Sequence, residues 1–271
     1  MMDPDRIDKE IAKAVRFFWS TRNKQATKQL QDGRADQGAR GSATGGKQMD
    51  GFVSIVRGVI QDLGIPKACI HCSTALELPG FFRPEKKWDL IVVDQGALVA
   101  AIEFKSQVGP SFGNNFNNRS EEAIGSAQDV WTAYREGAFR ASDRPWLGFV
   151  MLLEDCEGST KPVQVKQPHF DVFPEFNGAS YADRYKLLMN KLMRERLYDS
   201  CALLMSSRKE GVKGRSKIPD EALSFQQLAS ALSAKIISHL SLAGKRPKRF
   251  LAGRTMMQPS FHPKNLQNQF I

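Results

Sequence analysis

The sequence predicts an α/β sandwich, because amphipathic helical segments alternate with short apolar strands on both sides of a tight hairpin. Apolar residues that recur every three or four positions mark the helices, and short apolar runs bounded by turn residues mark the strands. We expect helices at residues 5–22, 49–63, 120–137, 181–197 and 225–240, and strands at residues 68–73, 90–93, 98–102, 146–153 and 201–205.

The N-terminal part contains two helices separated by a segment that cannot pack a core. The first helix, 5–22, is amphipathic and is followed by residues 31–48, which are rich in glycine and basic residues and have no large apolar side chain. We expect these residues to form a mobile loop that could order against phosphates. The second helix, 49–63, is followed by Gly64, a residue that commonly ends helices in the left-handed conformation.

The composition indicates a globular protein with a polyanionic partner. Hydrophobic residues make up 41% and charged residues 25% of the 271 positions, which are ordinary values. The net charge of +10 favours nucleic acid. An anionic membrane surface is the rival partner, but no basic amphipathic helix has an aromatic face. Because no apolar run has the length of a membrane span or a signal peptide, we expect no membrane contact and a cytoplasmic location.

The cysteines and histidines have ordinary interpretations. Four cysteines are too few for a disulfide scaffold in a chain of this length. Cys69 and Cys72 have the spacing of a zinc or redox pair, but no second pair accompanies them, so free thiols in or beside a strand are favoured. No histidine has a serine or carboxylate partner at a recognisable spacing, and we expect none of the four to act as a general base; they are His71, His169, His239 and His262.

The most informative residues are Asp89, Glu103 and Lys105, which a tight hairpin would bring together. If residues 95–97 form its loop, counting back along both strands places Asp89 opposite Glu103. Directly opposed residues of an antiparallel pair project to one face, with Cβ atoms about 4.5 to 5.5 Å apart. Lys105 lies two residues after Glu103, so strand alternation places it on the same face.

This arrangement suits metal-dependent phosphodiester cleavage. Two close carboxylates repel each other unless a cation lies between them, and their hard oxygens suit Mg²⁺, which also binds water and phosphate. Lys105 could orient or help deprotonate the attacking water and offset charge in the transition state. The residues match the PD-(D/E)xK nuclease pattern, with Trp88 in place of the usual proline. Taken alone, the motif also fits solvated charges at strand ends.

An amide-rich segment follows Lys105 and is predicted to be a loop before a helix that begins near residue 120. Amides can form two hydrogen bonds with adenine, and arginine can do the same with guanine. Asparagine-rich loops also form turns without any partner, but the short distance from Lys105 favours base readout. The candidate DNA-binding residues are Ser111, Asn114, Asn115, Asn117, Asn118 and Arg119.

Longer runs of sequence are shared with a known protein family. They are residues 48–52, 78–84, 88–90, 103–106, 108–118, 121–125, 154–156 and 178–181. Through these runs the chain resembles the XhoI family of type II restriction endonucleases over roughly residues 37–205. The run from Gly109 to Arg119 is far more specific than the nuclease motif. The resemblance implies a restriction-endonuclease-like fold, in which helices flank a central mixed β-sheet.

The resemblance also implies an activity and roles for the motif residues. It implies a Mg²⁺-dependent homodimer that cuts double-stranded DNA at the palindrome CTCGAG after the first C, leaves 5′ TCGA overhangs and is paired with a DNA methyltransferase. Asp89 and Glu103 would be metal ligands and Lys105 the catalytic lysine. Asp50 could be an additional acidic ligand, or simply a charge near a helix N-terminus. Individual base contacts are not implied.

We expect three parts in the chain. Residues 1–48 form the N-terminal helix and basic loop, 49–241 form the nuclease core with its recognition loop, and 242–271 form a basic tail that either contacts the DNA backbone or is solvated. The basic side chains of helix 181–197 either bind phosphates or form a solvated face. Glu154 and Asp155 end a strand and could join the metal site.

Two other functions fit the same residues. One is a structure-specific or repair nuclease that recognises the shape of DNA instead of its sequence. The other is a DNA-binding module without catalytic activity, for which Lys105→Ala would change nothing.

Overall fold

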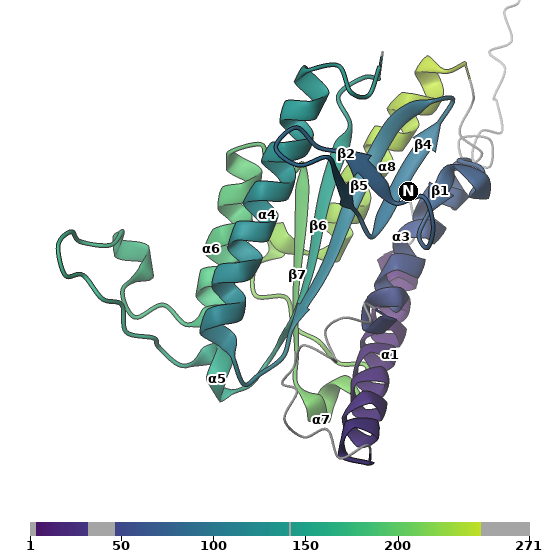
Figure 1. Cartoon of the computed structure of the whole chain (residues 1–271). Helices are drawn as coiled ribbons and strands as arrows, with labels where there is room; N and C mark the ends of the chain where they lie inside the picture. The colour runs from purple at the N-terminus through teal and green to yellow at the C-terminus, as the bar shows by residue number, and fades with distance from the viewer. Residues whose placement is uncertain (1–3, 32–46, 141, 245–271) are drawn as a thin grey trace, which may run out of the picture.

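A five-stranded mixed β-sheet forms the centre of the chain, with helices on both faces (Figure 1). The computed structural model describes residues 4–31, 47–140 and 142–244. The strand order is β1-β4-β5-β6-β7, with two antiparallel pairings followed by two parallel ones. The strands are β1 (Ile70–His71), β4 (Leu90–Asp94), β5 (Ala97–Gln107), β6 (Trp146–Glu154) and β7 (Ser200–Ser206). The predicted architecture, a central mixed sheet flanked by helices, is confirmed.

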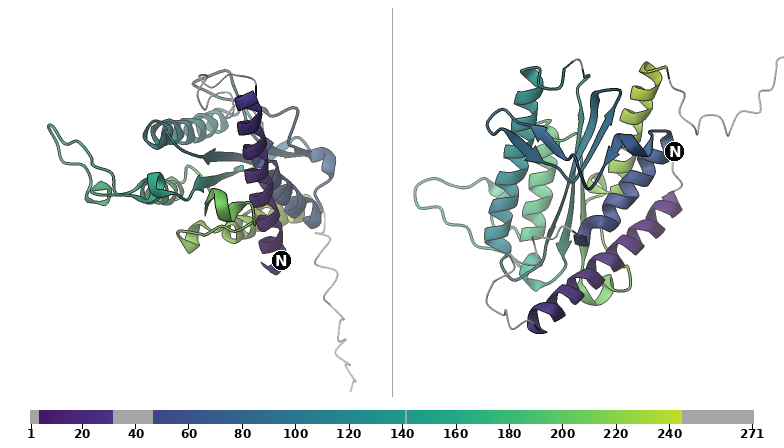
Figure 2. Two further views of the ribbon diagram at one scale, coloured as in Figure 1. Left: turned by 90° about the horizontal axis from the view of Figure 1, so that it is seen from below. Right: turned by 45° about the vertical axis from the view of Figure 1, so that its right-hand side comes forward.

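The helices form two layers around this sheet (Figure 2). One layer consists of α1 (Pro4–Gln31), α3 (Asp50–Leu63) and α8 (Phe225–Leu242), and the other of α4 (Phe112–Arg135) and α6 (Tyr181–Arg194). None of the helices in the described ranges has the length and apolarity that a membrane crossing requires. The predicted glycine-rich loop and basic tail fall mostly on residues 32–46 and 245–271, which lie outside the described residues.

Strand alternation divides the apolar side chains between the two layers. Leu90 and Ile102 belong to the core under α1, α3 and α8, whereas Ile91 and Ala101 belong to the core under α4 and α6. Glu103 follows Ile102 and therefore lies on the second face, toward α4 and α6. The same alternation that buries the two cores thus sets the face on which the acidic residue lies.

The β4–β5 hairpin reaches the predicted alignment by a different route. Its turn contains two residues, Gln95 and Gly96, and not the three predicted at 95–97. Their φ angles of 55° and 78° are the positive values that a two-residue hairpin turn requires. A register shift farther along the pair adds one residue to β5, so that Leu90 still pairs with Ile102.

The prediction of a loop at residues 109–119 is wrong, because helix α4 already begins at Phe112. Phe112 and Phe116 are spaced by one helical turn and both rings pack against Tyr181, with ring centroids 6.0 and 6.2 Å away. Phe116 also packs edge-on against Tyr185 at 5.0 Å. Burial of these two rings outweighs the turn preference of the asparagines between and after them.

Other elements differ from prediction at their boundaries. The first helix continues to Gln31 instead of ending at residue 22, and the strand expected at 68–73 is reduced to β1. A second hairpin, β2 (Glu77–Pro79) with β3 (Glu85–Lys87), was not predicted because its short charged strands lack apolar alternation. The remaining short elements are η1 (Lys47–Met49), η2 (Lys67–Cys69), α5 (Glu157–Thr160), η3 (Pro174–Phe176), α7 (Arg208–Gly211) and η4 (Glu221–Leu223).

Candidate active site

The structure brings Asp89, Glu103 and Lys105 together on the face of the sheet under α4 and α6. Because Leu90 pairs with Ile102, the preceding position sets Asp89 opposite Glu103. Oδ2 of Asp89 accepts a hydrogen bond of 2.7 Å from the backbone N–H of Phe104, the residue after Glu103 in β5. Nζ of Lys105 forms an ion pair with Oε1 of Glu103. The predicted convergence of two acids and a lysine is therefore present.

A second lysine, Lys86 of β3, completes this group and was missed from the sequence. Its Nζ lies 2.7 Å from Oε2 of Glu103 and 4.3 Å from the ring centroid of Trp88. Only 11% of the Lys86 side chain is exposed. In the sequence, the only sign of this role is that Lys86 lies in a basic stretch just before Asp89. The β2–β3 hairpin places this stretch over the motif residues. Each oxygen of the Glu103 carboxylate therefore has its own lysine partner.

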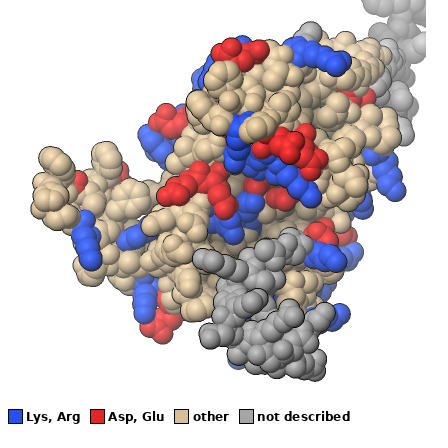
Figure 3. All heavy atoms as spheres, in the orientation of Figure 1, with Lys and Arg blue, Asp and Glu red and all other residues tan. Residues whose placement is uncertain are grey.

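Burial and these charges shift the pKa values of the group in opposite directions. Burial would raise the pKa of Glu103, but the ammonium groups of Lys105 and Lys86 outweigh it and lower that pKa. Burial, followed by repulsion from Glu103, raises the pKa of Asp89. Burial lowers the pKa of Lys86, although its pairing with Glu103 opposes this. Figure 3 shows positive and negative side chains interleaved at the centre of this face of the molecule.

The acidic pair fits a divalent ion that keeps much of its own hydration. Asp89 and Glu103 offer hard carboxylate oxygens, and Mg²⁺ is commonly held by one or two carboxylates together with water and phosphate. Within the described ranges, no group of three or more His, Cys, Asp or Glu could hold a metal ion. Each oxygen of the Glu103 carboxylate already contacts a lysine, so a cation that binds Glu103 would compete with the charges of Lys86 and Lys105.

The predicted DNA-binding residues lie on the first turns of α4, beside this group. Ser111 precedes the helix and is exposed, as are Asn114, Asn117 and Asn118, while Asn115 is half-buried. On a helix, positions three and four apart share a face, so Asn114, Asn117 and Asn118 form one exposed polar strip.

Arg119 links this helix to the active site. Its guanidinium pairs with Glu122 and acts electrostatically on Lys105, and its Nε is buried without a hydrogen-bond partner. The amide-rich turns are thus held next to the lysine that the motif analysis singled out.

Comparison with known proteins identifies the family. The family model described as restriction endonuclease XhoI matches residues 28–217, which include the acidic pair, both lysines and α4. The chain belongs to the XhoI family of restriction endonucleases. It is accordingly a type II restriction enzyme, as its curated relatives are.

Three relatives document this membership in the XhoI family. The type II restriction enzyme BstVI of Geobacillus stearothermophilus is 50% identical over 212 residues, which cover 76% of this chain and 95% of that enzyme. XhoI of Xanthomonas vasicola is 45% identical over 71% of this chain and 77% of its own length. AbrI of Azospirillum brasilense is 52% identical over 60% of this chain and 73% of its own length. No solved structure gives a significant match.

Three other acids suggested for the metal site of this XhoI-family enzyme, Asp50, Glu154 and Asp155, lie in different surroundings. Asp155 pairs with Lys217 at 2.8 Å. Asp50 is exposed on the first turn of α3 and lines a surface hollow with Glu10 and Lys13 of α1. Burial raises the pKa of Asp50, and the structure joins it to none of the three motif residues. Glu154 accepts a hydrogen bond of 2.8 Å from the backbone of Gly109 and pairs with Arg208 at 2.7 Å. Glu154 therefore fixes the turn between β5 and α4.

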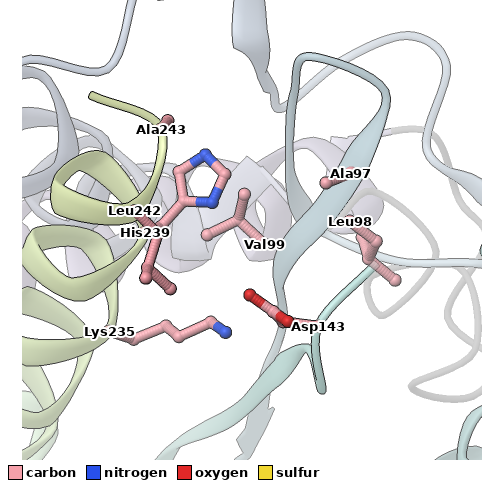
Figure 4. A pocket seen from close by; sticks show the side chains of 8 residues that line it. All are labelled: Ala97, Leu98, Val99, Asp143, Lys235, His239, Leu242 and Ala243. Carbon is pink, nitrogen blue, oxygen red and sulfur yellow. The ribbon is translucent and has the colours of Figure 1, made fainter. Parts of the chain in front are cut away.

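A pocket between α8 and the start of β5 is lined by a histidine, His239 (Figure 4). Nε2 of His239, in α8, lies 3.0 Å from Oδ2 of Asp94, a partner too distant in sequence to be predicted. Lys235 and Asp143 line the same pocket, which borders the start of β5. Because Val99 in its wall belongs to the core under α8, the pocket lies on the opposite face of the sheet from Glu103.

Proposed function

We propose that this XhoI-family enzyme hydrolyses double-stranded DNA at CTCGAG in a Mg²⁺-dependent reaction, cutting after the first C to leave 5′ overhangs. The observation that carries the proposal is the carboxylate of Glu103, held between Lys105 and Lys86 with Asp89 beside it. This group lies next to a helix that presents exposed amides. The curated relatives are named type II restriction enzymes, which supports cleavage of duplex DNA.

In this mechanism Asp89 and Glu103 would hold the metal ion, which when bound would neutralise charge and polarise water. Lys105 would orient the attacking water and offset the negative charge that develops on the phosphoryl oxygens. The oxygen of water loses a proton to solvent and forms a bond to phosphorus while the bond to the 3′ oxygen breaks, and the leaving 3′ oxygen takes up a proton from solvent water to become a hydroxyl. Lys86, whose Nζ lies 2.7 Å from Oε2 of Glu103, would add a second positive charge beside the same phosphate.

Sequence recognition is assigned to the start of α4. Its exposed amides can bond adenine edges and Arg119 can bond guanine; the residues proposed for contact with DNA are Ser111, Asn114, Asn115, Asn117, Asn118 and Arg119. A palindromic target is read most simply by a two-fold homodimer that presents one active site to each strand. A methyltransferase of the same specificity would protect the host DNA, and both enzymes would act in the cytoplasm.

A plasmid digest tests the proposal. A supercoiled plasmid with one CTCGAG site should become linear with Mg²⁺ and stay intact with EDTA, and the ends should map to the site. Lys105→Ala should reduce cleavage by about a hundredfold or more while binding to a labelled CTCGAG duplex persists. Lys13→Ala, which alters an exposed lysine of α1, is the control and should cut normally.

Each alternative has its own outcome in that experiment. Intact circles at every enzyme concentration would contradict cleavage and leave a DNA-binding module. Fragment ends that do not map to CTCGAG would retain the nuclease but exclude this recognition site, as a nuclease that reads DNA shape would require.

A further inference from the structure

The β2–β3 hairpin ends in two phenylalanines that point into solvent. Phe81 and Phe82 lie in its tip, residues 80–84, with side chains 55% and 71% exposed. Their rings pack edge to face, with centroids 5.5 Å apart. Two adjacent, exposed aromatic side chains form an apolar patch of a kind that commonly marks a contact site.

A buried carboxylate holds this tip in place. Asp129 of α4 accepts hydrogen bonds from the backbone N–H groups of Phe81 at 2.6 Å and Phe82 at 2.8 Å, and from Nε of Arg83 at 2.7 Å. A Cβ at Gly80 would lie 2.3 Å from Oδ2 of Asp129, so only glycine permits this approach. The exposed rings are therefore carried on a backbone fixed to α4, and their position is set before any partner arrives.

The tip is also connected directly to the active site. The chain runs from Phe82 along β3 to Lys86, whose ammonium contacts Glu103. Four residues span at most about 14 Å. This distance corresponds to about four base pairs of duplex, at roughly 3.4 Å each. A duplex with a phosphate at the active site can therefore reach the tip when its axis runs along the hairpin.

The hairpin tip and the asparagines are held at two different positions along α4. Asp129, which fixes the tip, is fifteen residues after Asn114, or roughly 22 Å along the helix axis. That separation is close to the width of a DNA duplex. The polar strip of α4 and the aromatic tip can therefore contact the duplex at separate positions.

We propose that Phe81 and Phe82 form an aromatic wedge that inserts against the base stack of the substrate DNA, within about four base pairs of the bond that is cut. This inference rests on the proposed function, because it takes duplex DNA as the substrate. Apolar side chains that enter a base step unstack it and bend the duplex, and stacking on an aromatic ring is tolerant of sequence. The wedge thus deforms the site, and the α4 amides read it.

Fluorescent DNA tests the wedge directly. A duplex of CTCGAG with 2-aminopurine in place of its adenine, and two further duplexes with the probe two and four base pairs outside the site, are bound to the Lys105→Ala enzyme, which does not cut. Unstacking raises 2-aminopurine fluorescence, so at least one duplex should brighten on binding. Adding Phe81→Ala and Phe82→Ala should remove the increase and weaken binding about tenfold.

Phe173→Ala in the same Lys105→Ala background is the matched control. This residue is also exposed, at 75%, but lies between α5 and α6 on a segment that extends away from the sheet (Figure 2). Its fluorescence signal and affinity should match those of the Lys105→Ala enzyme. Circular dichroism should give the same helical signal for every variant.

Two results would overturn the wedge. One is equal affinity and equal fluorescence with and without the phenylalanines. The other is an unchanged DNA signal together with dissociation into monomers in sedimentation velocity, which would assign the tip to contact with a second copy of the chain. Failure of the proposed function looks different, because the Lys105→Ala enzyme would then bind CTCGAG no better than a scrambled duplex.

Discussion

Glu103 is the residue at which two lysines would compete with the proposed divalent ion. Lys86 and Lys105 each occupy one of its carboxylate oxygens, and a divalent ion needs at least one of them. The ion pairs hold the carboxylate ionised and oriented, since they lower its pKa despite burial. A divalent ion bound at Glu103, as proposed, would compete with these lysines and could free one of them to contact a phosphate.

Replacing Lys86 separates these two roles. Lys86→Ala removes a competing positive charge, so Mg²⁺ should bind more tightly, by about threefold to tenfold. The same change removes a charge that stabilises the transition state, so single-turnover cleavage should slow by about 10²- to 10³-fold. Titration calorimetry with Mg²⁺ and rapid-quench cleavage of a CTCGAG duplex measure the two effects.

The neighbouring lysine is the control for that experiment. Lys87 is exposed on the same short strand, and Lys87→Ala should leave both quantities within about twofold of the original enzyme. Weaker Mg²⁺ binding by Lys86→Ala would contradict the competition, and unchanged cleavage would remove Lys86 from the reaction.

At the scale of elements, one clamp joins the β2–β3 hairpin to α4. Burial raises the pKa of Asp129, but the hydrogen bonds donated by Phe82, Arg83 and Phe81 outweigh it and hold that pKa below its ordinary value. A carboxyl group whose pKa is lower in the folded state stabilises the fold at pH values above its unfolded-state pKa of about 3.9. This contribution is lost as the pH falls through the folded-state pKa.

Asp129→Asn should therefore destabilise the protein in a pH-dependent way. An amide has one acceptor oxygen where the carboxylate has two, so the free energy of unfolding should fall by about 1 to 3 kcal/mol at pH 7. The difference from the original protein should shrink as pH is lowered from 5 to 3. Urea unfolding followed by circular dichroism at several pH values measures it.

An exposed ion pair provides the comparison for Asp129→Asn. Asp62 pairs with Arg6 at the surface, so Asp62→Asn should change the free energy of unfolding by about 0 to 1 kcal/mol. An Asp129→Asn effect no larger than this, or one that persists unchanged at pH 3, would mean that the carboxylate does not hold the hairpin.

The elements also show what the sequence could and could not reveal. The apolar strands were predictable because both their faces are buried. The alignment of Asp89 with Glu103 was predictable as well, because the shorter turn and the bulge shift the register by equal and opposite amounts. The hairpin that carries Lys86 was not predictable, because its strands are held by Asp129, forty-three residues after Lys86, and not by an apolar pattern of their own. Long-range polar contacts leave no periodic signal.

At the scale of the whole molecule, the proposed nuclease core of residues 49–241 has α1 packed onto it. Buried residues of α1, among them Val15, Phe18 and Trp19, belong to the same core as α3 and α8. The face opposite this helix layer carries the active site, the amide strip and the aromatic tip. Recognition, cutting and deformation are therefore assigned to one side of the sheet.

The net charge of +10 acts on DNA of any sequence, whereas the proposed contacts of the α4 amides would act on chosen bases. These two contributions can be separated by salt. Binding of the Lys105→Ala enzyme to duplex DNA should weaken by about 10³- to 10⁵-fold between 50 and 200 mM salt if six to ten phosphates are contacted, for CTCGAG and scrambled DNA alike.

Asn117→Ala with Asn118→Ala should then lower the affinity for CTCGAG by about tenfold or more, because bonds to base edges are lost, and leave the slope of affinity against salt unchanged. Fluorescence anisotropy with both duplexes measures affinity and slope together. Glu136→Ala, an exposed change just beyond the C-terminal end of α4, is the control and should leave the preference for CTCGAG unchanged. The slope of affinity against salt should change by no more than the loss of one charge requires. A double asparagine variant that loses affinity equally for both duplexes would place the start of α4 on the phosphate backbone and move sequence recognition to another part of the chain.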